Sequence, residues 1–155
     1  MTAMVVQFIC RGNAFRSIIA EAYLNSLRIP GLTVLSSGTV ASRYKDENVV
    51  NFPKTLALLM RHGTEQYAKD HHADQINQKQ LDKSDIAVCL NKIAYDEAVT
   101  SYKLPKETYI WDVADLGEEG RIPTSEVQRE SFAEDVYQEI INNVNSLVTE
   151  HRLYS

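Results

Sequence analysis

Two short stretches decide the fold: Ala3-Met-Val-Val-Gln-Phe-Ile9 and, directly after it, Cys10-Arg-Gly-Asn-Ala-Phe-Arg16-Ser17. The first is a compact apolar run rich in β-branched and aromatic residues, which is typical of a buried strand. Gly12 and Asn13 then mark a tight loop. Apolar residues recur at helical spacing from Ser17 onward. The stretch therefore predicts a buried strand, a loop and a helix in that order.

The same alternation of strands and helices continues along the chain. Apolar runs predict three further strands, over residues 33–36, 85–90 and 109–113. Helical spacing and end signals predict helices over residues 17–28, 53–63 and 91–100, and a long helix after a capping box at residues 125–128. Such alternation implies a parallel sheet covered by helices on both faces. Ligands of such sheets bind at the carboxyl ends of the strands, where Cys10 is expected.

Composition narrows the class of protein. The 155 residues fit a single domain, residues 1–155, with 44% hydrophobic residues and no repeat. The net charge of −5 and the scattered basic residues predict neither a nucleic-acid partner nor a membrane partner. The apolar run at the N-terminus is too short for a signal peptide or a membrane span. Two cysteines in a chain of this size indicate a reducing compartment, so a cytoplasmic location is expected.

The loop of residues 10–17 carries residue types that suit binding of an oxyanion. A loop that curls before a helix aims its N–H groups at an anion, and the helix dipole adds to that field. Gly12 allows close backbone approach and a positive φ, while Asn13 tolerates left-handed geometry. The guanidinium of Arg16 can hold two phosphate oxygens, and the positive field favours a Cys10 thiolate. The hydroxyl of Ser17 can donate to that thiolate.

These residues resemble the low-molecular-weight protein tyrosine phosphatases and their relatives, the thiol-dependent arsenate reductases. The family pattern is a strand, then Cys-x-Gly-Asn-x-x-Arg-Ser, then a helix that continues as Ala-Glu-Ala, as it does here at residues 20–22. Ser36-Ser-Gly-Thr39 is similar to the family's Ser-Ala-Gly-Thr turn, and His62-Gly63 to the pair that closes its second helix. Residues 85–89 resemble the strand that follows.

The resemblance implies a fold, a reaction and a set of site residues. The fold would be a three-layer α/β sandwich with a four-stranded parallel sheet, whose phosphate-binding loop joins the first strand to the first helix. Cys10 would be the nucleophile, Arg16 would hold the phosphate and Asp115 would be the general acid. Ser36 and His62 would support the loop through Asn13. The substrate-binding residues would be Arg11, Gly12, Asn13, Ala14, Phe15 and Ser17.

The implied activity is hydrolysis of phosphate monoesters, including phosphotyrosine, through a cysteinyl-phosphate. The substrate would be a phosphorylated protein or a small phosphomonoester. No organic cofactor is expected, and no metal either, because the cysteines and histidines lack paired zinc-ligand spacing.

The chain departs from the family pattern at four places. Ile18 replaces a proline after Arg-Ser, and Phe15 replaces a second cysteine, so no vicinal disulfide can protect Cys10. Leu116 replaces the proline of the Asp-Pro acid loop, and the tyrosines that follow it in the tyrosine-phosphatase branch are missing. Residues 74–76 stand where the family often has an arginine.

Two alternatives remain open at the level of sequence. One is an arsenate reductase that uses an external thiol, because a thioredoxin-coupled relay needs more cysteines than Cys89, which falls on a predicted buried strand. The other is a non-catalytic phosphate-binding relative, suggested by the altered acid loop. The intact Cys10–Arg16 pair favours an enzyme, since binding alone does not require the cysteine.

Overall fold

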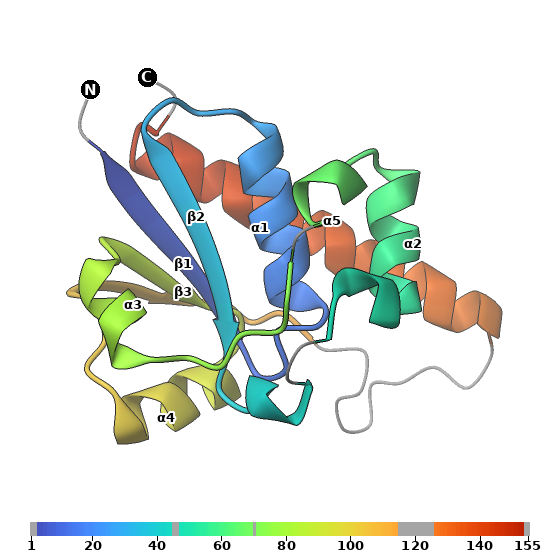
Figure 1. The fold of residues 1–155 in the computed structure, drawn as a ribbon. Coiled ribbons are helices and arrows are strands. Elements are labelled where there is room, and N and C mark those ends of the chain that lie inside the picture. The colour runs from blue at the N-terminus through green and yellow to red at the C-terminus, as the bar shows by residue number, and fades with distance from the viewer. Residues whose placement is uncertain (1–2, 45–46, 70, 115–125, 154–155) are drawn as a thin grey trace.

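The computed structural model describes residues 3–44, 47–69, 71–114 and 126–153. Its centre is a sheet of four parallel strands: β1 (Met4–Cys10), β2 (Leu32–Gly38), β3 (Ile86–Cys89) and β4 (Glu107–Ile110). The strand order is β2-β1-β3-β4, so β1 and β3 are the inner strands (Figure 1). The predicted parallel sheet is confirmed.

Helices lie on both faces of this sheet, which completes the predicted three layers (Figure 1). On one face are α1 (Arg16–Ser26) and α5 (Glu126–Glu150), with α2 (Pro53–Arg61) packed beside them. On the other face are α3 (Gln78–Lys83) and α4 (Lys92–Ser101). Three short 3-10 helices lie between β2 and α3: η1 (Ala41–Tyr44), η2 (Val49–Asn51) and η3 (Glu65–Tyr67).

Strand β1 is buried on both faces, which explains its predominantly apolar sequence, in which Gln7 is the polar exception. Val6 and Phe8 pack into the core formed with α1 and α5, whereas Ile9 packs into the smaller core formed with α3 and α4. All three side chains are fully buried. Burial of one such side chain contributes about 1.5–3 kcal/mol. These contacts fix the strand in the centre of the sheet and therefore fix the position of Cys10 at its carboxyl end.

The ends of the helices follow the expected signals. Pro53 opens α2, and Asn91 caps α4 by accepting a hydrogen bond from the Ala94 N–H at 3.0 Å. Gly63 follows α2 with a φ of 72°, as predicted for the residue after a helix end. Of the predicted capping box, Ser125 lies outside the described residues.

Two differences from the sequence prediction concern the edge of the sheet and the short helices. Strand β4 ends at Ile110, the partner of Cys89 at the end of β3, and not at Val113, although the Val113 N–H still donates to the backbone oxygen of Leu90 at 2.9 Å. Helix α3 and the 3-10 helices were not predicted, since each is too short to show a clear period. Within the described residues, none of the helices is both long enough and apolar enough to cross a membrane.

Candidate active site

The loop of residues 11–15 lies at the point where the strand order changes direction. From β1 the chain crosses through α1 to β2 on one side, whereas β3 lies on the other side. In open α/β sheets ligands bind at this position, outside the carboxyl ends of the strands. Cys10 is the last residue of β1, and α1 begins six residues later at Arg16. The structure therefore brings the predicted loop to the expected end of the sheet.

The Cys10 sulfur is buried and faces polar groups of its own loop. Its side chain is 2% exposed. The backbone N–H of Asn13 donates to Sγ at 3.2 Å, and the Ser17 hydroxyl lies 2.9 Å from it. Asn13 has a φ of 54°, and Gly12 is not among the described residues with positive φ. The left-handed turn of the loop therefore falls on Asn13, where it aims the N–H at the sulfur, and the positive φ that Gly12 would allow is not used.

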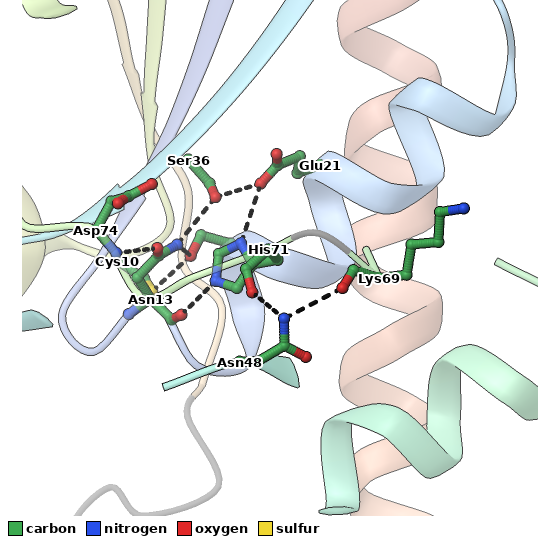
Figure 2. A network of polar contacts seen from close by, with 9 residues as sticks. Cys10, Asn13, Glu21, Ser36, Asn48, Lys69, His71 and Asp74 are labelled. Atoms are coloured by element: carbon green, nitrogen blue, oxygen red, sulfur yellow. Dashed lines mark hydrogen bonds and ion pairs between the residues drawn. The ribbon is translucent and has the colours of Figure 1, made fainter. Parts of the chain in front are cut away.

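The Asn13 side chain holds the loop to three other segments (Figure 2). Its Nδ2 donates to the Ser17 hydroxyl at 2.7 Å and to the Ser36 hydroxyl at 3.0 Å. Its Oδ1 accepts from the Asp74 N–H at 2.9 Å. The contact with Ser36 is the one that the sequence predicted. Asn13 is fully buried, so these bonds fix the loop in one conformation.

His71 is a loop contact that the sequence did not predict. Its Nε2 lies 3.1 Å from the backbone oxygen of Asn13, and its Nδ1 lies 3.7 Å from Oε2 of Glu21, which also accepts from the Ser36 hydroxyl (Figure 2). The His71 side chain is 5% exposed. Desolvation raises the pKa of the nearby Asp74 carboxyl, and the His71 ring partly opposes that shift. No local pattern distinguishes His71 from a surface histidine.

The predicted role of His62 in supporting the loop is wrong. Its Nε2 contacts Glu134 of α5, and its ring stacks on Tyr137 with centroids 3.9 Å apart. The neighbouring Arg61 also pairs with Glu134, at 2.7 Å. The reason is that α2 ends against α5, so the residue that follows this helix meets a carboxylate on α5 before it can reach Asn13. The backbone oxygen of Asn13 is contacted by His71 instead.

The guanidinium of Arg16 is buried at the first turn of α1. The residue is 1% exposed, and Nη1 donates to the backbone oxygen of Val113 at 2.9 Å. Val113 belongs to the segment after β4, which also contains the exposed Asp112. The loop arginine is thus held against the segment that leads to Asp115. Asp115 itself lies outside the described residues.

Arg11 forms an ion pair that the sequence did not predict. Its Nε donates to Oε1 of Glu97 at 2.9 Å, and its Nη2 donates to Oε2 at 3.2 Å. The Thr39 hydroxyl donates to the same Oε1 at 2.8 Å, and the Thr39 N–H donates to the backbone oxygen of Cys10 at 3.0 Å. Glu97, on α4, therefore ties the first half of the loop to the turn after β2.

The remaining loop residues pack closely against their surroundings. The backbone oxygen of Ala14 accepts from the Thr55 hydroxyl at 2.6 Å, and Phe15 is buried in the larger core. Gly38 faces the loop from β2: a Cβ at this position would lie 2.4 Å from the Arg11 oxygen and 2.8 Å from the Asn13 nitrogen. The close approach of β2 to the loop therefore requires glycine here.

Cys89 lies on the opposite side of the sheet from Cys10. Its strand partner is Ile9, so its side chain shares the face of Ile9 and packs against α3 and α4. Cys10 follows Ile9 directly and points to the other face. Cys89 is fully buried, and burial raises its pKa to about 12. The two thiols cannot approach each other without breaking the sheet.

The described residues hold no group of three or more histidine, cysteine, aspartate or glutamate side chains that could bind a metal ion. The candidate site consists of the loop amides, the Cys10 thiol and the Arg16 guanidinium, with Ser17 and Asn13 beside the sulfur.

Comparison with known structures agrees with this description of the fold. Wzb of Vibrio vulnificus, in complex with benzylphosphonate, matches with a TM-score of 0.77 at 18% identity, covering 95% of this chain and 98% of that one. The Drosophila arginine phosphatase DARP matches with a TM-score of 0.73 at 17% identity, covering 96% and 98%. A thioredoxin-dependent arsenate reductase of Corynebacterium glutamicum matches with a TM-score of 0.69 at 22% identity, covering 99% and 64%.

Similarity of sequence identifies the family. No protein with a curated functional description matches the chain. The family of low molecular weight phosphotyrosine protein phosphatases matches residues 5–151, nearly the whole length. The chain therefore belongs to the low molecular weight phosphotyrosine protein phosphatase family and is a phosphoric monoester hydrolase.

Proposed function

We propose that this hydrolase acts through a phosphorylated Cys10 and that phosphotyrosine is among its phosphate monoester substrates. The observation that carries the proposal is the position of the Cys10 sulfur, at the carboxyl end of β1, with the Asn13 N–H at 3.2 Å and the Ser17 hydroxyl at 2.9 Å. A buried structural thiol has no need of such polar neighbours. Both cysteines are free, which fits a reducing, cytoplasmic setting.

The first step transfers the phosphoryl group to the enzyme. The Cys10 thiolate attacks phosphorus in line with the ester oxygen, so an S–P bond forms while the P–O bond breaks. The leaving oxygen takes a proton from Asp115, which we assign as the general acid because it occupies the position of the family's acid-loop aspartate. Arg16 and the loop amides bind the equatorial oxygens, where charge is concentrated in the transition state.

The second step returns the enzyme to its starting state. A water molecule attacks phosphorus from the side that the leaving group vacated, and Asp115 accepts its proton. The S–P bond breaks, inorganic phosphate leaves and Cys10 is again a thiolate. The Ser17 hydroxyl, 2.9 Å from Sγ, can donate to the departing sulfur. No step in this cycle uses a metal ion or an organic cofactor.

The loop is preorganised for this chemistry by contacts on both of its sides. Asn13 joins it to Ser36 and to the backbone of Asp74, while Glu97 joins Arg11 to Thr39. A loop already held in the binding conformation does not have to be ordered when the substrate arrives. These contacts support a fixed arrangement in which the Cys10 thiol and the loop amides act on the same phosphate.

The positions of the thiols argue against an arsenate reductase with an internal disulfide relay. Such an enzyme needs a second cysteine that can attack the Cys10 adduct. Cys89 is fully buried on the other face of the sheet, and burial raises its pKa to about 12, which disfavours the thiolate that such an attack needs. Reduction by an external small thiol needs only Cys10 and is the alternative that the experiment must test.

The direct experiment compares wild type and Cys10→Ser in two assays. We expect wild type to hydrolyse p-nitrophenyl phosphate, and Cys10→Ser to lose turnover while it still binds vanadate. Arsenate reduction with glutathione is measured beside it. Absence of hydrolysis together with vanadate binding by wild type would instead support a non-catalytic relative, and thiol-dependent arsenate reduction without hydrolysis would support the reductase.

A further inference from the structure

The two arginines of the loop point in different directions. Arg16 is buried and donates to the backbone oxygen of Val113, on the segment after β4. Arg11 extends to Glu97 on α4, the helix that covers the other face of the sheet. The Arg11 side chain is 38% exposed and the Glu97 side chain 32%. The second guanidinium of the loop is therefore at the surface and paired with a carboxylate.

The pairing matters because Arg11 directly follows the nucleophile. Consecutive Cα atoms are about 3.8 Å apart, and an arginine side chain is long enough to reach an anion bound in front of Cys10. Two contacts with Glu97 and the shared contact of Glu97 with Thr39 hold the guanidinium on α4 instead. The carboxylate also cancels its charge, so the anion at Cys10 experiences little net field from the pair.

If Glu97 did not hold the Arg11 guanidinium, that positive charge would strengthen binding of every anion at this loop. Inorganic phosphate, the product of the proposed reaction, carries about two negative charges, so it would gain more than a singly charged ligand does. Tighter binding of product slows its release, and in many enzymes that release limits turnover.

We propose that Glu97 is a specificity-determining residue that sets the net charge beside the Cys10 loop. By holding and neutralising Arg11, it limits the affinity of the loop for inorganic phosphate and for highly charged phosphoanions. Monoesters with a single phosphate group are the substrates that this net charge favours. This inference rests on the proposed function, since it assumes that Cys10 and its loop are the site of phosphate binding.

The field at Cys10 can be measured without turnover, with two alkylating reagents. Iodoacetate and iodoacetamide each form a thioether with the Cys10 thiolate and release iodide, but only iodoacetate is an anion. The ratio of their alkylation rates reports the electrostatic potential at the sulfur. Changes in thiol ionisation or loop mobility affect both reagents alike and therefore cancel in the ratio. Cys89 is fully buried and does not contribute in the folded protein.

Comparison of wild type, Glu97→Gln, Arg11→Met and the double variant separates an effect of charge from an effect of structure. Glu97→Gln removes the negative charge that pairs with Arg11, so the iodoacetate-to-iodoacetamide ratio should rise by about threefold or more for one charge in this setting. Arg11→Met leaves the Glu97 charge, so the ratio should fall by a similar factor. In the double variant the charges at positions 11 and 97 sum to zero, as they do in wild type, so its ratio should return close to the wild-type value. A purely structural role predicts no such return.

A matched control removes the same charge from the same helix. Asp96 neighbours Glu97 in sequence but pairs with Lys92 at 2.9 Å on the exposed side of α4. Asp96→Asn should leave the ratio within about 1.5-fold of wild type, because exposed charges remote from the loop are screened.

Inhibition by inorganic phosphate gives the second readout. The inhibition constant should fall by about tenfold in Glu97→Gln, since a doubly charged ligand experiences twice the change in potential. A raised inhibition constant in Glu97→Gln, or a double variant whose ratio does not return, would overturn the inference even if wild type hydrolyses its substrate. If wild type has no hydrolase activity, the proposed function fails, while the alkylation ratios still test the role of Glu97.

Discussion

Replacing Gly38 by alanine is expected to damage the active loop from outside it. Gly38 is the last residue of β2 and lies beside Cys10 in the sheet. A Cβ here would be 2.4 Å from the Arg11 backbone oxygen and 2.8 Å from the Asn13 nitrogen, separations that real Cβ atoms essentially never show. Restoring 3.0 Å to the oxygen requires a shift of about 0.6 Å.

The size of the effect follows from which atoms must move. Both atoms belong to the loop backbone, and the Asn13 nitrogen is the one that donates to Cys10 Sγ. A misplacement of about 1 Å at a catalytic site costs up to about 100-fold in rate. We therefore expect kcat/KM for p-nitrophenyl phosphate to fall by about 10- to 100-fold. Overpacking should also lower the free energy of unfolding by about 1–3 kcal/mol.

The chain offers a matched control in Gly63. This residue has a φ of 72°, and an added Cβ would meet nothing within 4 Å. Gly63→Ala should cost about 1–2 kcal/mol of backbone strain in a urea unfolding experiment and leave kcat/KM near the wild-type value. If the two variants lose the same stability and Gly38→Ala retains the activity of Gly63→Ala, the account of the loop geometry is refuted.

Three further predictions follow from the site. His71→Ala should lower kcat by up to about tenfold, because a contact with the loop is lost. His62→Ala should lower the free energy of unfolding by about 1 kcal/mol and leave kcat unchanged. Steady-state kinetics and urea unfolding measure both effects, and the reverse pattern would restore His62 as the loop support. Iodoacetamide should alkylate one thiol of the native protein near neutral pH, Cys10, and Cys89 should react only after unfolding. Rapid alkylation of both thiols in the folded protein would contradict the burial of Cys89. Asp115→Asn should lower kcat by about 10²–10⁴-fold for alkyl phosphates but much less for p-nitrophenyl phosphate, and a larger loss in Asp112→Asn would move the acid to Asp112.

Much of the fold could be predicted from the sequence, because the central strands are buried on both faces. The apolar runs of β1, interrupted by Gln7, and of β3 reflect that burial, and Pro53 and Gly63 mark the two ends of α2 as predicted. The end of β4 could not be predicted, because the extent of an edge strand depends on how it pairs with its neighbour. That limit is set by pairing and leaves no trace in the local sequence.

The loop itself was predictable, whereas its support was only partly so. The identity and order of residues 10–17 point to an anion site because those side chains are neighbours in sequence. Contacts made over long sequence separations carry no such signal: His71 lies 58 residues from Asn13, and Glu97 lies 86 residues from Arg11. The assignment of support to His62 failed for this reason, since the packing of α2 on α5 decides where its ring lies.

Detection of a phosphorylated Cys10 tests the central claim most directly. Wild type is mixed with p-nitrophenyl phosphate, quenched in acid during turnover and digested for mass spectrometry. We predict one added phosphoryl group on the peptide that contains Cys10, its loss on incubation without substrate, and its absence from Cys10→Ser. Turnover by Cys10→Ser, or a phosphoryl group carried by another residue in wild type, would contradict the account.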